Sequence, residues 1–212
     1  YLRHRERDSP MTNVVITGST QGIGYGLAAE FCNRGDNVTI AGRDQQNLEK
    51  ALDNLGDKPG QVTGIPCDVT RAEDVQALWD HAATQFGAVD IWINNAGRDG
   101  LKMPFFALPV DDYMLTVQTN VIGLLNCNRV VIPEMYQQGG GAIFNMEGFG
   151  SNGQIRPTTG VYGMTKYALR YFTKAISKEL EKTPVRMGYL SPGIVVTDML
   201  VPPPDKRGEG WE

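Results

Sequence analysis

The sequence lacks three features that would each point to a class of protein. No apolar run approaches the roughly 20 residues that a membrane-spanning helix needs. The net charge is -4, so no excess of basic side chains favours binding to nucleic acid. Only three cysteines are present, Cys32, Cys67 and Cys127. Their odd number and scattered positions fit no metal site, so we expect buried free thiols in a reducing compartment.

The length and composition are those of one ordinary globular domain. The chain has 212 residues, of which 41% are hydrophobic and 21% are charged. We expect a charged N-terminal leader over residues 1–10, a folded domain over residues 11–200 and a proline-rich C-terminal tail over residues 201–212. Because the chain begins with Tyr1 rather than methionine, we interpret it as a processed fragment whose targeting signal is not in the sequence.

A glycine-rich loop follows the first predicted strand. The β-branched run Val14–Thr17 is typical of a buried parallel strand, and a helical pattern runs from Tyr25 to Arg34. Between them, Gly18, Gly22 and Gly24 let the backbone approach a pyrophosphate, which the N-terminus of a helix attracts. Their spacing differs from the older Gly-x-Gly-x-x-Gly fingerprint. The alternative is a glycine-rich turn that binds no ligand.

The end of the second predicted strand, Val38–Ala41, bears on the choice of cofactor. Gly42 stands where an NAD site needs a carboxylate for the ribose 2′-hydroxyl. Arg43 offers a guanidinium suited to a 2′-phosphate, so the sequence favours NADPH over NADH. Asp44 leaves two alternatives, because its carboxylate can pair with Arg43 or cap the next helix.

The rest of the chain alternates between helical and strand patterns. We expect helices over 45–55, 71–86 and 111–138, another helix around Tyr162, and strands over 62–68, 91–93, 142–146 and 185–190. This alternation predicts an α/β fold, a single Rossmann-type doubly wound parallel sheet with helices on both faces.

Polar residues stand where a ligand site is expected. The run Asn94–Gly97 directly follows the fourth strand, at the sheet edge where open α/β folds bind ligands, although asparagines there can also be turn formers. Asn120 lies among apolar residues of the long helix, and a buried asparagine needs hydrogen-bond partners. It either bonds the backbone at a kink or holds a water molecule beside the active site.

Tyr162 and Lys166 are four residues apart and therefore share one face of a helix. An ammonium beside a phenol favours the phenolate, so we expect Lys166 to lower the pKa of Tyr162 from its usual value of about 10. A phenol poised nearer neutrality can protonate a carbonyl oxygen or accept a proton from an alcohol. Taken alone, such a pair also occurs by chance on solvated helices.

Together these motifs resemble the short-chain dehydrogenase/reductase superfamily. The resemblance rests on five motifs in order, namely Thr17–Gly24, Asn94–Gly97, Asn120, Tyr162 with Lys166, and Ser191–Gly193. It implies that Lys166 grips the nicotinamide ribose while tuning Tyr162, and that Asn120 holds a proton-relay water.

The same resemblance implies that the domain is an NADP-binding reductase domain with NADPH as its cofactor. Asp68 would face the adenine, Asn95 would lie beside the cofactor ribose, and Thr197 would touch the carboxamide or the pyrophosphate. The implied cofactor-binding residues are Gly18, Ser19, Thr20, Gln21, Gly22, Ile23, Gly24, Arg43, Asp68, Val69, Asn95, Ala96, Gly97, Tyr162, Lys166, Pro192, Gly193, Ile194 and Thr197.

One position departs from the family pattern. Members usually carry a serine just after the fifth strand, where it hydrogen-bonds the substrate carbonyl, and here Gly148 takes its place. Ser151 and Glu147 are the nearest substitutes, and a protonated Glu147 can donate a hydrogen bond. Alternatively, Glu147 is an ionised residue at the cleft rim and Ser151 an ordinary loop residue. The candidate catalytic residues are Tyr162, Lys166, Asn120, Ser151 and Glu147.

The same segment gives a narrower resemblance. Phe144–Ser151 is similar to the Phe-Asn-Met-Asp-Gly-x-Gly-Ser segment of plant and algal chlorophyll b reductases, with Glu147 in place of the aspartate. This subfamily implies NADPH-dependent reduction of the C7 formyl group of chlorophyll b, or chlorophyllide b, to hydroxymethyl, with Tyr162 as proton donor. It implies a chloroplast location, the alternative being the cytoplasm. Peripheral association with the thylakoid membrane and assembly into homo- or hetero-oligomers stay open.

A large, flat substrate needs an apolar cleft, and the segment 101–108 is apolar enough to line one. The same segment equally fits a hydrophobic loop packed on the core or an oligomer contact. Two other functions stay open: a generic short-chain reductase of small ketones or 3-oxoacyl thioesters, and a catalytically weak subunit that binds a cofactor for a partner. The intact Tyr162, Lys166 and Asn120 argue against the last.

Overall fold

The computed structural model describes residues 11–193 and residue 195. Several expectations concern other parts of the chain. The leader, the proline-rich tail, the end of the domain near residue 200 and the cofactor contacts of Ile194 and Thr197 all lie outside the described residues.

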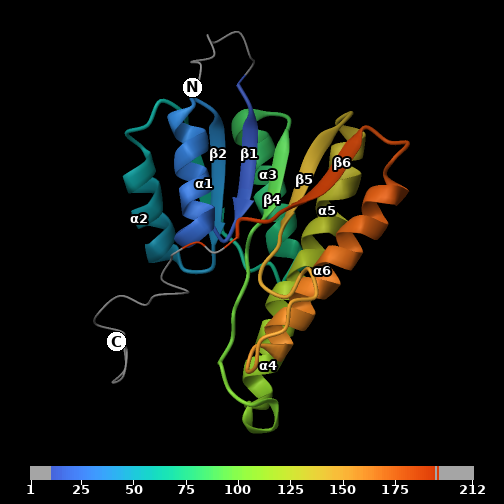
Figure 1. Ribbon diagram of the computed structural model, residues 1–212. Coiled ribbons are helices and arrows are strands. Elements are labelled where there is room, and N and C mark those ends of the chain that lie inside the picture. Colours follow the sequence, from blue (N-terminus) through green and yellow to red (C-terminus); the bar gives the residue numbers. More distant parts are fainter. Residues whose placement is uncertain (1–10, 194, 196–212) are drawn as a thin grey trace, which may run out of the picture.

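Six parallel strands form one sheet (Figure 1). They are β1 (Asn13–Thr17), β2 (Asn37–Gly42), β3 (Val62–Pro66), β4 (Ile91–Asn94), β5 (Gly141–Met146) and β6 (Val185–Leu190). Their order is β3-β2-β1-β4-β5-β6, so the direction of winding reverses between β1 and β4. At such a reversal, the carboxyl ends of the two strands open a crevice in which ligands bind.

Helices cover both faces of the sheet, which confirms the predicted doubly wound fold. They are α1 (Gly22–Asn33), α2 (Gln45–Leu55), α3 (Ala72–Phe86), α4 (Val110–Val117), α5 (Gly123–Gln137) and α6 (Gly160–Glu179). Ala28 of α1 and Leu48 of α2 are buried in one core cluster. Leu78 of α3 and Val131 of α5 are buried in the other, with Leu180 at the end of α6.

The central strands are buried on both sides, because the two helical layers leave no solvent-facing surface there. All but the first residue of β1 is buried, as is every residue of β2. This explains why these strands appear in the sequence as continuous β-branched runs without polar alternation. The free thiols of Cys32, Cys67 and Cys127 are buried, as predicted.

Two predicted elements differ from the structure. The strand expected over 62–68 ends at Pro66, because its partner β2 ends at Gly42, the residue paired with Pro66. The helix expected over 111–138 is interrupted by a π-helical turn, η2 (Gln118–Ile122), between α4 and α5. Single π turns are often found at functional sites, and this one contains Asn120.

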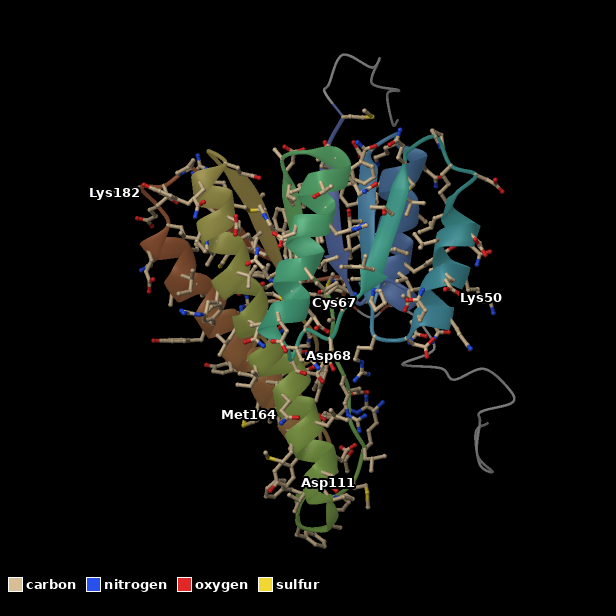
Figure 2. All side chains as sticks on the ribbon, turned by 180° about the vertical axis from the view of Figure 1, so that it is seen from behind. Lys50, Cys67, Asp68, Asp111, Met164 and Lys182 are labelled. Carbon is tan, nitrogen blue, oxygen red and sulfur yellow. The ribbon has the colours of Figure 1, made fainter. Side chains whose placement is uncertain are left out.

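The segment between β4 and α4 runs from the carboxyl edge of the sheet to a projecting tip, as both views show (Figures 1 and 2). It includes a short 3-10 helix, η1 (Phe105–Ala107), and Asp111 lies at the tip, near the start of α4. Within residues 11–193, no helix combines the length and the apolar character needed to cross a membrane.

Candidate active site

The predicted phosphate loop joins β1 to α1. Its Gly18 and Gly22 both have a φ of 61°, a left-handed conformation that favours glycine. A Cβ at Gly18 would also lie 2.7 Å from the Cα of Ala96. The side-chain amide of Asn95 donates to the carbonyl oxygens of Thr17, at 3.0 Å, and Gly18, at 2.7 Å. The loop is therefore fixed to the end of β4 as well as to β1.

A cleft of about 570 Å³ opens at this edge of the sheet. Most of the expected cofactor-binding residues line it, namely Gly18, Thr20, Gln21, Gly22, Ile23, Arg43, Asp68, Val69, Asn95, Ala96, Gly97, Tyr162 and Lys166. Figure 2 shows Asp68 near this edge, beside Cys67. Seven further lining residues were not among the expected site residues, although Gly42 and Asp44 were considered for the choice of cofactor: Gly42, Asp44, Asn47, Cys67, Arg98, Thr119 and Met146. Most of them adjoin a predicted site residue, and that adjacency is the signal that could have found them.

Some expected contacts are absent from the cleft wall. Ser19 is fully buried, and its hydroxyl donates to the carbonyl oxygen of Ile16 at 2.6 Å and accepts from the backbone N–H of Ala41 at 3.0 Å. Its side chain ties β1 to β2 and does not line the cleft. Gly24 lies beneath the loop, where a Cβ would overlap the Asn95 amide. Pro192 and Gly193 are exposed and do not line the cleft.

The structure decides between the two alternatives for Asp44. Its carboxylate accepts a hydrogen bond from the backbone N–H of Asn47 at 2.8 Å, so it caps the N-terminus of α2. Arg43 forms no ion pair within the described residues, is exposed and lines the cleft. Arg43 is therefore available to the cleft, and the carboxylate of Asp44 is engaged elsewhere.

Asn120 is buried in the π turn and bonds the backbone, as one of the two alternatives proposed. Its Oδ1 accepts from the backbone N–H of Arg98 at 2.7 Å, and its Nδ2 donates to the carbonyl oxygen of Arg98 at 2.8 Å. The same Nδ2 donates to the hydroxyl of Thr165 at 3.0 Å. Both N–H groups of the amide are engaged, so a water beside Asn120 would have to donate to Oδ1 or use the main chain. The residue connects the start of the β4–α4 segment to α6.

Tyr162 and Lys166 lie together in the cleft, as predicted, with the Lys166 ammonium 5.8 Å from the centre of the tyrosine ring. The predicted direction of the tyrosine pKa is wrong. Burial, with a smaller contribution from Asp99, raises the pKa of Tyr162 to about 12. Burial also lowers the pKa of Lys166 to about 8, against the opposing charge of Glu147. The Lys166 ammonium donates to the carbonyl oxygen of Met146 at 3.0 Å.

Comparison with known proteins agrees with this geometry. The family model for short chain dehydrogenases matches residues 12–207. The chain belongs to the short-chain dehydrogenase family. The probable chlorophyll(ide) b reductase NYC1 of Arabidopsis thaliana is 41% identical over 207 residues, which cover 89% of this chain and 42% of the relative. Chlorophyll(ide) b reductase NOL of the same plant is 40% identical over 203 residues, covering 93% of this chain and 58% of the relative. This short-chain dehydrogenase thus spans about half the length of these curated relatives.

Solved structures share the fold. A 3-ketoacyl-(acyl-carrier-protein) reductase from Brucella melitensis, complexed with NADH, has a TM-score of 0.83 and 30% identity, covering 89% of this chain and 78% of its own. An actinorhodin polyketide ketoreductase with NADPH has a TM-score of 0.83 and 29% identity, covering 89% of this chain and 73% of its own.

The position that departs from the family pattern has a steric explanation in this short-chain dehydrogenase. A Cβ at Gly148 would overlap the hydroxyl of Tyr162, and it would lie 3.1 Å from the tyrosine Cζ and 3.2 Å from the Cε of Lys166. The tyrosine therefore lies against the backbone of Gly148. A serine at this position is incompatible with the observed placement of Tyr162.

The two proposed substitutes for the serine form a buried pair. The hydroxyl of Ser151 donates to Oε2 of Glu147 at 3.2 Å, and Oε1 of Glu147 lies 3.4 Å from Nε of Arg170. Glu147 lines the cleft, whereas Ser151 lines no described cavity. The Ser151 hydrogen is directed at Glu147, so this geometry does not bring it to a substrate.

A second cavity, of about 220 Å³, lies beyond the tyrosine. The apolar side chains of Leu101, Met103, Phe105 and Leu108 line one wall, as one of the alternatives for segment 101–108 proposed. Residues 156–159, which precede α6, and Gly160, Val161 and Tyr162 in its first turn also line this cavity. The segment is not packed entirely on the core, because Phe105 is 72% exposed and Phe106 is 93% exposed.

Proposed function

We propose that this short-chain dehydrogenase is an NADPH-dependent reductase that converts the C7 formyl group of chlorophyll b or chlorophyllide b to hydroxymethyl. The observation that carries the proposal is the position of Tyr162. Among the described residues, it alone lines both the larger cleft and the smaller cavity. Its phenol can therefore contact a cofactor bound in one space and a carbonyl group bound in the other.

The larger cleft suits a dinucleotide. Its glycine-rich loop and the N-terminus of α1 offer backbone N–H groups to a pyrophosphate. Arg43 at the end of β2 favours a 2′-phosphate, because Asp44 is engaged at the N-cap of α2. The similar structures that contain NADH or NADPH support a nicotinamide cofactor, and the choice of NADPH rests on Arg43.

A bound NADPH would supply the hydride for the formyl carbon. Tyr162 would donate its phenolic proton to the carbonyl oxygen, which converts –CHO to –CH₂OH. Because the pKa of Tyr162 is raised to about 12, the phenol is protonated before the reaction, as a proton donor must be. Lys166, close to the ring, would stabilise the phenolate that remains.

The substrate side of the site favours an aldehyde on a large apolar body. A cavity of about 220 Å³ cannot enclose a macrocycle. Such a ring would enter by its formyl edge and rest against the exposed aromatic side chains of Phe105 and Phe106. The relatives named chlorophyll(ide) b reductase, chloroplastic, support this substrate and a chloroplast location. The same exposed apolar tip suits a protein bound peripherally to the thylakoid membrane.

A second candidate is the reduction of a small ketone or 3-oxoacyl thioester. The small volume of the second cavity favours it, as does the likeness to a 3-ketoacyl-(acyl-carrier-protein) reductase. The two candidates share Tyr162 and Lys166, so only the substrate separates them.

The proposal is tested with purified protein in mild detergent. Chlorophyll b, chlorophyllide b and a short 3-oxoacyl thioester are each incubated with NADPH or NADH, and the products are separated by chromatography. We expect hydroxymethyl pigment, with NADPH much better than NADH. Turnover of the thioester alone would establish the second candidate. No turnover of any substrate, with NADPH still bound, would favour a catalytically weak cofactor-binding subunit.

A further inference from the structure

A buried ionic cluster lies next to the catalytic pair, and the chemistry above does not use it. The side chain of Glu147 is only 1% exposed, with one oxygen near Arg170 and the other accepting from Ser151. A buried charge is costly unless it is paired and hydrogen-bonded. A neutral residue would avoid this cost, so the retained carboxylate calls for a function.

Lys166 approaches the backbone on both sides of Glu147. Its ammonium donates to the carbonyl oxygen of Met146 at 3.0 Å, and its Cε lies 3.2 Å from the place of a Cβ at Gly148. The lysine thus contacts the residues on either side of Glu147. Arg170, the partner of Glu147, stands one turn further along the same face of α6.

The far side of the cluster is fixed to the sheet. The Arg170 guanidinium lies over the ring of Tyr189 in β6, 5.0 Å from its centre, and donates to its hydroxyl at 3.4 Å. The backbone N–H of Glu147 donates to the carbonyl oxygen of Leu190, also in β6, at 2.8 Å. The carboxylate is therefore held between the end of β5, the end of β6 and helix α6.

We propose that Glu147 is a positioning residue whose carboxylate, clamped by Arg170 and Ser151, keeps Lys166 charged and in place beside Tyr162. This inference rests on the proposed reductase function. It replaces the idea that Glu147 donates a hydrogen bond to substrate, because Ser151 donates to Oε2 and the Arg170 guanidinium forms an ion pair with Oε1, which accepts no hydrogen bond within the described residues.

The charges around Lys166 determine in which direction its pKa should change when Glu147 is replaced. Glu147 faces it from the end of β5, while Tyr162 and Arg170 lie on its own helix, and Asp99 acts on Tyr162 from the β4–α4 segment. Burial lowers the pKa of Lys166 to about 8, and Glu147 opposes that shift. Removing this negative charge therefore makes the ammonium lose its proton at lower pH.

The test follows the titration of Lys166 directly. Protein labelled with ¹³C-lysine gives a ¹³Cε resonance for Lys166, assigned by its loss in Lys166→Met. We expect a midpoint near 8 in the wild type, and a fall of about one pH unit or more in Glu147→Gln. Because Arg170→Met retains the Glu147 carboxylate, we expect the titration midpoint of Lys166 not to fall in this variant. Glu179→Gln, which removes an exposed glutamate of the same helix, is the matched control.

The double variant Glu147→Gln with Arg170→Met keeps the test decisive if the single variant does not fold, because it replaces the ion pair with a neutral pair. The Lys166 midpoint should fall in this double variant by the same amount as in Glu147→Gln. The alkaline limb of the plot of kcat/KM against pH should move to lower pH in the two variants that lack the Glu147 carboxylate, and not in Arg170→Met. An unchanged Lys166 midpoint in the Glu147 variants overturns the proposal, as does an equal fall in Arg170→Met. This titration needs no turnover, so failure of the reductase function would appear separately, as an inactive wild type.

Discussion

Restoring the family serine with Gly148→Ser should impair this protein. In most proteins, returning a position to its family pattern is neutral or stabilising. Here the new Cβ would overlap the Tyr162 hydroxyl and come within 3.2 Å of the Cε of Lys166. The tyrosine has to move by about 1 Å to regain ordinary contact distances of about 3.5 Å.

The displacement affects catalysis more than folding. The end of a tyrosine side chain can move without the backbone, so we expect a loss of about 1–3 kcal/mol of stability, typical of overpacking. For a chain of this size, that lowers the Tm by roughly 2–12 °C. A misplacement of about 1 Å at the proton donor costs on the order of 100-fold in rate. NADPH binding should change less than the rate, because Gly148 does not itself line the cleft.

The assay measures kcat for the formyl pigment, NADPH affinity and Tm for the wild type, Gly148→Ser and a matched control. Gly26→Ala serves as the control, since a Cβ there meets nothing within 4 Å in the exposed part of α1. We expect the control to keep full activity and to gain slightly in stability. A kcat for Gly148→Ser equal to or above that of the wild type would refute the steric reasoning and show that the family serine can be accommodated.

The other predictions concern single side chains of the cleft. Arg43→Ala should weaken NADPH binding far more than NADH binding in fluorescence titrations, with exposed Arg129→Ala as control; an equal loss for both cofactors removes the basis for the choice. Ser151→Ala should keep kcat within about threefold, because its hydrogen is directed at Glu147; a larger loss would place Ser151 in contact with substrate. Lys166→Met should abolish turnover yet stabilise the fold at pH 7 by about 1–3 kcal/mol, since a buried ammonium is removed. Because the folded pKa of Lys166 lies below its unfolded value, wild-type stability should rise relative to this variant between pH 8 and 9.5, as calorimetry can follow; a constant difference contradicts the lowered pKa.

The fold was predictable because its elements carry strong local signals. Strand β6 and helix α2 have the predicted bounds, and every other predicted strand and helix is present. The π turn at Asn120 was not predictable, because its residues fit an ordinary helical pattern. The turn accompanies a tertiary contact, since the Asn120 amide bonds the backbone of Arg98, which is 22 positions away in the sequence.

The sequence located the site better than it described the chemistry there. Tyr162 and Lys166 do share a cleft wall, but their spacing indicates only that a charge is near. It does not indicate burial, which has the larger effect on the pKa of Tyr162 and the opposite sign. The missing serine at Gly148 was also evident in the sequence. That the Tyr162 hydroxyl lies where its Cβ would be is a property of the folded chain alone.

The origin of the hydrogen in the product tests the central claim most directly. The protein is incubated with the formyl pigment and NADPH that carries deuterium at C4 of the nicotinamide, using each stereoisomer in turn, and the product is examined by mass spectrometry. The account predicts one deuterium on the hydroxymethyl carbon from one of the two stereoisomers, and no product with Tyr162→Phe. Product without deuterium from either stereoisomer, or unimpaired turnover by Tyr162→Phe, would contradict it.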